Sequence, residues 1–150
     1  MRVYLDNNAT TKMDKEVLDA MMPYLTDCFG NSSSLHLFGA ETNKALKAAR
    51  EEISNFMGIK PDELIFTASG SEADNLAIRG VARAYKKRGK HIITSSIEHP
   101  AVKNTLKDLQ EDGFEVTTLK VDENGLIDLE ELKKSIREDT ILITDRKSVV

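Results

Sequence analysis

A chain of 150 residues that is 40% apolar and 31% charged is long enough to fold around a hydrophobic core as one domain. Its net charge of −4 and its lack of a basic run argue against a nucleic-acid partner. Its apolar runs, about five residues long, are too short to cross a bilayer, so no membrane partner is expected. The single cysteine excludes an internal disulfide and favours a reducing, cytoplasmic location.

The first part of the chain is predicted to be mainly helical. Residues 2–5 are typical of a short strand. Asp14 can cap a helix that is expected to run to about residue 29, with Pro23 inside it. A second helix is expected over residues 40–57. The residues predicted to face inward from this second helix are Ala45, Leu46, Ala49, Ile53 and Phe56.

The stretch over residues 64–75, which reads LIFTASGSEADN, carries the strongest local signals. Its opening apolar run predicts a buried strand over residues 64–67, followed by small hydroxylated residues. Ser69 and Glu72 have the spacing of a capping box, so a helix is expected to begin just after Ser69.

A helix that begins there leaves the backbone N–H groups of Gly70 and Ser71 free. Free N–H groups and the positive end of the helix dipole suit a phosphate, and the Ser71 hydroxyl can add a donor. A capped turn between a strand and a helix, with no ligand, explains the same pattern. The residues by themselves leave both interpretations open.

From residue 64 onward the predicted strands and helices alternate, which indicates an α/β fold with a mostly parallel sheet and helices on both faces. In such sheets ligands gather at the carboxyl ends of the strands. Residues 67–71 and 95–99 both lie at such ends, so they are expected to share one edge. The further strands are predicted over His91–Ser95, residues 114–121 and Thr140–Thr144, and the further helices over residues 100–112 and 129–137.

The three histidines receive different predictions. His99 lies in a loop between a strand and a helix, where an imidazole can face a ligand or simply be solvated. A structural role is expected for His36, and exposure to solvent for His91. Since no cysteine–histidine cluster has metal-ligand spacing, no metal site is expected.

Four motifs, in matching order and spacing, resemble the amino-terminal part of cysteine desulfurases, which are class-V pyridoxal 5'-phosphate (PLP) enzymes. The resemblance covers about residues 2–144. Asn7, Asn8 and Thr10 match a family loop near the active-site mouth, without assigned roles. The matching motifs are YLDNNATT at residues 4–11, FGNSSSLH at 29–36, FTASGSEADNLAIRG at 66–80 and IEHPAV at 97–102.

The resemblance implies a PLP-dependent transferase fold of type I and assigns three site residues. Gly70 and Ser71 are expected to bind the cofactor phosphate, at positions where the family usually has Ala-Thr. His99 is expected to stack on the pyridine ring and to assist proton transfers, which makes it the one catalytic residue predicted. Ser32 stands where the family usually has proline.

The implied activity converts L-cysteine to alanine and passes sulfur, as an enzyme persulfide, to iron–sulfur cluster or thio-cofactor synthesis. A sulfur-acceptor or scaffold protein is the implied partner, and the complete enzyme is expected to be a homodimer. Two alternatives stay open: a selenocysteine lyase or other class-V PLP enzyme, and a non-catalytic α/β phosphate-binding module.

The resemblance also divides the chain. Residues 1–62 are expected to be an N-terminal helical segment, residues 63–144 a partial PLP-binding large domain, and residues 145–150 a divergent tail. The Schiff-base lysine and the persulfide cysteine of the family match no position here. The chain is therefore expected to be an amino-terminal fragment that binds PLP weakly or not at all and is inactive alone.

Overall fold

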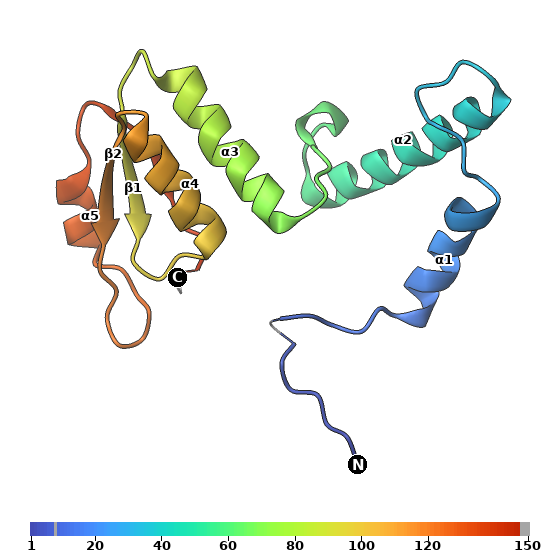
Figure 1. The fold of residues 1–150 in the computed structure, drawn as a ribbon, viewed down its shortest axis with the longest axis horizontal. Coiled ribbons are helices and arrows are strands. Elements are labelled where there is room, and N and C mark those ends of the chain that lie inside the picture. Colours follow the sequence, from blue (N-terminus) through green and yellow to red (C-terminus); the bar gives the residue numbers. More distant parts are fainter. Residues whose placement is uncertain (8, 148–150) are drawn as a thin grey trace. The chain divides into compact units, whose positions relative to one another are not determined.

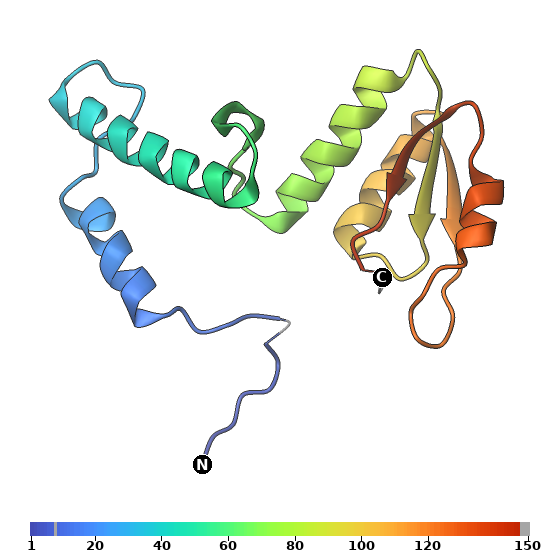
Figure 2. The ribbon, with the colours of Figure 1, turned by 180° about the vertical axis from the view of Figure 1, so that it is seen from behind.

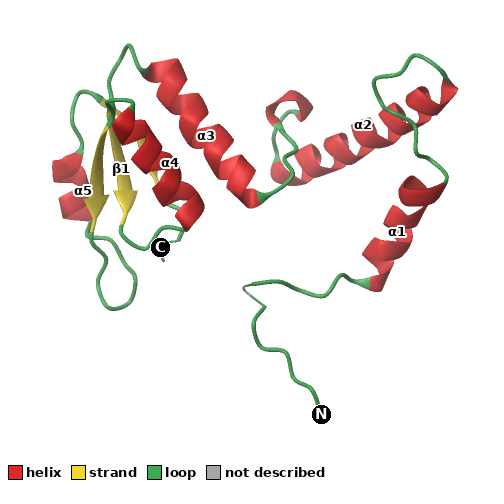
Figure 3. Ribbon diagram, in the orientation of Figure 1, coloured by secondary structure: helices red, strands yellow, loops and turns green. Residues whose placement is uncertain are grey.

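The computed structural model describes residues 1–7 and 9–147, so Asn8 and the last three positions of the predicted tail lie outside the described residues. Contacts divide the chain into two units, Met1–Ile65 and Phe66–Val150. Figures 1 and 3 show the helices and strands. The first unit holds α1 (Lys15–Thr26), α2 (Leu37–Met57) and the short 3-10 helix η1 (Pro61–Glu63). The second holds α3 (Gly70–Tyr85), β1 (His91–Ser95), α4 (Pro100–Glu111), β2 (Glu115–Leu119), α5 (Leu129–Ser135) and β3 (Thr140–Thr144).

In the first unit, α1 begins where its cap predicts. The Asp14 side chain accepts a hydrogen bond from the N–H of Glu16 at 2.9 Å. Pro23 lies inside the helix without ending it, and the helix continues to Thr26. The predicted end near residue 29 was therefore three residues too far.

The second helix, α2, begins three residues earlier than predicted, because His36 caps it by accepting a hydrogen bond from the N–H of Gly39 at 3.4 Å. The prediction that its apolar residues face inward was wrong: Leu46 is 42% exposed and Phe56 is 93% exposed. Within the described part of this unit, α2 packs against the short η1, which is too small to cover that face.

The sheet of the second unit is centred on β1. All five of its residues are buried, and it pairs with β2 on one side and β3 on the other. Both pairings are parallel, with His91 opposite Glu115 on β2 and Thr140 on β3. Figure 2 shows β3 beside β1. The predicted α/β class with a parallel sheet is confirmed.

Helices cover this sheet on both faces. α3 and α4 pack against each other, α3 contacts β3 and α4 contacts β2, while α5 contacts β2. The chain moves from β1 to β2 through α4 and back across β1 to β3 through α5, so right-handed crossovers place α4 and α5 on opposite faces. The core of buried apolar side chains consists of Ile78, Ala82, Ile92, Val102, Leu106 and Leu109.

Two predicted strands, over residues 2–5 and 64–67, do not form. Leu64 has extended backbone angles, but a strand also needs a partner backbone, and residues 64–67 pair with none of the three strands of the sheet. Ile65 is consequently 66% exposed instead of buried. Among the residues that the structure describes, no helix is both long and apolar enough to cross a membrane.

The predicted exposure of His91 was wrong, since its side chain is 1% exposed. Its Nδ1 lies 2.7 Å from the Thr140 hydroxyl and its Nε2 lies 2.8 Å from the Thr117 hydroxyl. The two flanking strands thus cover the ring and satisfy both nitrogens. Burial, and next the charge of Arg137, lowers the pKa of His91 below its usual value of 6.5.

We expect this histidine to make stability depend on pH. Because the pKa of His91 is lower in the folded state, the unfolded state binds more protons just below pH 6.5. The contribution of His91 to the free energy of unfolding should therefore be constant above that pH, fall as the pH drops from 6.5 toward the native pKa, and level off below the native pKa. Urea unfolding at several pH values measures this, with His91→Gln as the non-titrating control. Equal pH slopes for the two proteins would contradict the expectation.

Candidate cofactor site

The first turn of α3 is built as the capping box predicts, with one difference. The Ser69 hydroxyl accepts a hydrogen bond from the N–H of Glu72 at 3.2 Å. The Glu72 carboxylate bonds to the N–H of Ala68 at 2.7 Å, one residue before the cap. In the described part of the chain, no acceptor is recorded for the N–H groups of Gly70 and Ser71.

The surroundings of Gly70 are open on the side where a side chain would begin. A Cβ added at Gly70 would have one atom within 4 Å, Nη2 of Arg146, at 3.9 Å. Two unbonded N–H groups, a serine hydroxyl and a nearby guanidinium form a donor set that suits a phosphate ester. The residues present therefore fit the phosphate group of PLP.

His99 is the N-cap of α4, where Pro100 takes the first helical position as predicted. Its Nδ1 accepts a hydrogen bond from the N–H of Ala101 at 3.1 Å. In the neutral ring this bond places the proton on Nε2. The half-buried imidazole is thus held by its own helix, and its Nε2 makes no hydrogen bond to the described residues.

Ser71 and His99 lie at the same edge of the second unit. Two polar contacts join α3 and α4 at similar distances from their first residues. The Thr105 hydroxyl donates to Asn75 Oδ1 at 2.6 Å, and Arg79 forms an ion pair with Asp108. The helices therefore run in parallel with their starts level, beside the carboxyl end of β1, as Figure 1 shows. This arrangement is what a shared ligand requires; the ligand contacts themselves stay a prediction.

Two further residues at this edge were given no role by the sequence. Glu98 is a carboxylate with only 2% exposure, and Arg146 forms an ion pair with Asp74 at 3.2 Å. The sequence signal that could have indicated a role for Glu98 is its position, a charged residue between a buried strand and the cap of a helix. Arg146 follows β3, and its place beside α3 depends on the tertiary fold, which no local pattern reveals.

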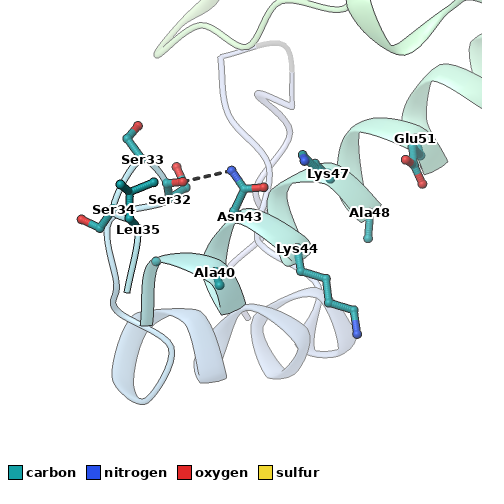
Figure 4. A pocket seen from close by; sticks show the side chains of 11 residues that line it. Ser32, Ser33, Ser34, Leu35, Ala40, Asn43, Lys44, Lys47, Ala48 and Glu51 are labelled. Carbon is teal, nitrogen blue, oxygen red and sulfur yellow. Dashed lines mark hydrogen bonds between the residues drawn. The ribbon is translucent and has the colours of Figure 1, made fainter. Parts of the chain in front are cut away.

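The first unit has a pocket of its own, shown in Figure 4. The side chain of Asn43 donates to the carbonyl of Ser32 at 3.0 Å and so fixes the serine-rich loop to α2. Lys44, Lys47 and Glu51 also line the pocket, and this mixture of charges favours no single class of ligand. Among the described residues, no group of His, Cys, Asp or Glu is placed to hold a metal ion.

Comparison with known proteins supplies the family. Residues 3–146 match the aminotransferase class-V family. The chain belongs to this family. The match spans both units and includes Gly70, Ser71 and His99.

Named class-V relatives are close in sequence. The chain is 54% identical over 143 residues to a protein named cysteine desulfurase IscS from Neisseria meningitidis. The aligned residues cover 95% of this chain and 35% of the relative. The chain is also 53% identical over 142 residues to a protein of the same name from Dictyoglomus turgidum, covering 95% of this chain and 36% of the relative. The chain thus spans about a third of the length of these relatives.

Solved structures of the class-V family share the fold. A NifS-like protein matches with a TM-score of 0.93 and 42% identity, over 97% of this chain and 40% of that one. A structure described as SspA in complex with cysteine matches with a TM-score of 0.88 and 42% identity, over 95% of this chain and 41% of that one. Membership of the class-V fold is therefore supported by sequence and by structure.

Proposed function

We propose that this chain is part of a PLP-dependent cysteine desulfurase and carries the residues that hold the cofactor phosphate and face its ring. The 54% identity over 95% of the chain to a protein named cysteine desulfurase carries the proposal. Because the chain spans 35% of that relative, the activity is proposed for the protein as a whole. The chain's own share is the binding edge formed by α3 and α4.

Each residue of this edge has a proposed task. The N–H groups of Gly70 and Ser71, with the Ser71 hydroxyl, bind the phosphate at the positive end of α3. The imidazole of His99 lies against the pyridine ring, and its Nε2 can hold or pass a proton because Nδ1 is engaged with Ala101. When bound, PLP supplies the electron sink that lets bonds to the substrate's α-carbon break.

The same proposal covers substrate, partners and location. L-cysteine is the proposed substrate, supported by relatives named cysteine desulfurase and by the cysteine complex of SspA. A homodimer, a sulfur-acceptor or scaffold protein, a role in iron–sulfur cluster synthesis and a cytoplasmic location are proposed from the family resemblance. A selenocysteine lyase and a non-catalytic phosphate-binding module are less favoured, because the relatives named above are desulfurases.

Titration of the chain with inorganic phosphate tests the phosphate part of the site. We expect the amide NMR signals of Gly70 and Ser71 to shift together, because their N–H groups have no competing acceptor in the described chain. Ser71→Ala removes one hydroxyl donor and should weaken binding about three- to tenfold. Ser135→Ala removes a half-buried serine hydroxyl on α5, in another helix, so it is the matched control and should leave phosphate binding unchanged.

Phosphate titration can also contradict the proposed site. If phosphate shifts amides elsewhere while those of Gly70 and Ser71 stay unchanged, the start of α3 is only a capped turn. The proposed cofactor site would then be wrong.

A further inference from the structure

Glu98 is a carboxylate buried in the second unit, between the end of β1 and the cap of α4. Burying a charged group is costly unless hydrogen bonds replace its water. One carboxylate oxygen, Oε1, accepts three bonds: from the Ser95 hydroxyl at 3.1 Å, from the N–H of Arg146 at 2.7 Å and from the N–H of Lys147 at 3.2 Å. These three hydrogen bonds therefore hold the Glu98 side chain in one position at this edge of the second unit.

These bonds connect two neighbouring strands. Ser95 is the last residue of β1, whereas Arg146 and Lys147 follow β3, which pairs with β1 in parallel. The carboxylate thus ties the segment after β3 to the loop that leads into α4. The residue after Glu98 is His99, so these hydrogen bonds hold the backbone directly before the histidine of the proposed site.

The bonds to Glu98 hold the backbone of Arg146 at this edge, and its side chain reaches α3. Its Nε is 3.2 Å from a carboxylate oxygen of Asp74 on α3, and its Nη2 is 3.9 Å from the position of a Cβ at Gly70. The guanidinium therefore lies along the first turn of α3. Its side chain is 42% exposed, and Asp74 engages one part of it, so other N–H groups can meet a ligand.

The second oxygen of Glu98 adds an independent observation. Oε2 is buried and has no hydrogen-bond partner among the described residues. A half-satisfied buried carboxylate is a poor choice for stability alone, since an apolar or neutral residue would avoid the cost. Its presence beside His99 is better explained by a task at the site.

We propose that Glu98 is a positioning residue that fixes the segment after β3 and thereby holds the Arg146 guanidinium beside the start of α3, where it adds a cation for the phosphate ester. The inference rests on the proposed function, because it assigns both residues to the same phosphate site. It adds to that site a side-chain cation, Arg146, that lies outside the motifs at residues 66–80 and 97–102.

The test is phosphate titration of the whole chain followed by amide NMR. Arg146→Gln should weaken binding about tenfold, because a charge-assisted bond is lost, while the Gly70 and Ser71 signals still shift at higher phosphate. Glu98→Ala should cause a similar loss, and the double variant should lose no more than either single one. Arg83→Gln, which removes the same charge in the last turn of α3, should leave the affinity unchanged.

A direct signal separates positioning from folding. Phosphate should shift the side-chain Nε–H resonance of Arg146 in the parent chain and not in Glu98→Ala. Should Glu98→Ala fail to fold, Glu98→Gln retains one acceptor oxygen, and the hydrogen-exchange rates of the Arg146 and Lys147 amides replace it as the readout. Faster exchange of both amides with weaker phosphate binding supports the inference, and unchanged rates and affinity overturn it.

The phosphate affinities of the variants separate this inference from the proposed function. Equal phosphate affinity of Arg146→Gln and the parent chain overturns the role of Arg146, while the proposed function stands as long as Gly70 and Ser71 respond. Additive losses in the double variant overturn the positioning role of Glu98. No response of Gly70 and Ser71 in the parent chain overturns the proposed function and this inference together.

Discussion

An alanine at Gly89 is expected to lower the free energy of unfolding of the second unit by about 2–4 kcal/mol. The added Cβ would lie 2.1 Å from the carbonyl oxygen of Asp139 and 2.6 Å from its carbonyl carbon. These are backbone atoms, and that oxygen already accepts a hydrogen bond from the N–H of His91 at 3.1 Å. The clash would therefore separate β1 from β3 at the point where their pairing begins.

Urea unfolding followed by circular dichroism measures this effect. Gly80→Ala is the matched control, because a Cβ there has nothing within 4 Å. Alanine in the middle of α3 should stabilise the helix by about 0.5–1 kcal/mol. If Gly89→Ala proves as stable as the parent chain, the close backbone approach does not exist.

Truncation of Ile92 is expected to have the other large effect, a loss of about 3–4 kcal/mol. This residue is fully buried on β1, the central strand, where it belongs to the cluster that joins the sheet to α3 and α4. Ile92→Ala would leave a cavity between these elements. Because both helices start at the proposed site, the shifts of Gly70 and Ser71 caused by phosphate should also weaken.

The same truncation on a neighbouring strand provides the comparison. Ile143 lies on β3 and is 46% exposed, so Ile143→Ala should cost less than about 1.5 kcal/mol. Unfolding of the two variants by urea, under one set of conditions, gives the difference. Equal losses would mean that β1 is not the buried centre of the sheet.

The sequence predicted features that depend on neighbouring residues. The cap at Ser69, the proline that opens α4 and the bounds of β1 follow from local hydrogen bonding, chain stereochemistry and short apolar runs, and the structure confirms them. The parallel sheet followed from the alternation of strands and helices. The shared edge of Ser71 and His99 was predicted from a strand over residues 64–67 that does not form; in the structure it comes from the packing of α3 against α4.

Features that depend on distant partners could not be predicted in this way. Residues 64–67 have strand-like composition but pair with no strand in the described chain. His91 follows basic residues, yet hydroxyls from two other strands enclose it. Arg146 reaches α3 only because β3 ends beside β1, so its sequence context gave no indication of this position.

The central claim is that one ligand meets Gly70, Ser71 and His99 together. Pyridoxine 5'-phosphate tests it directly, since it has the phosphate and the ring of PLP but no aldehyde to react with lysines. Titrated into the chain, it should shift the amides of Gly70 and Ser71 and the ring protons of His99 with a single dissociation constant, whereas pyridoxine without phosphate should not. Shifts of the two amides with an unmoved His99, or binding elsewhere in the chain, would contradict the account.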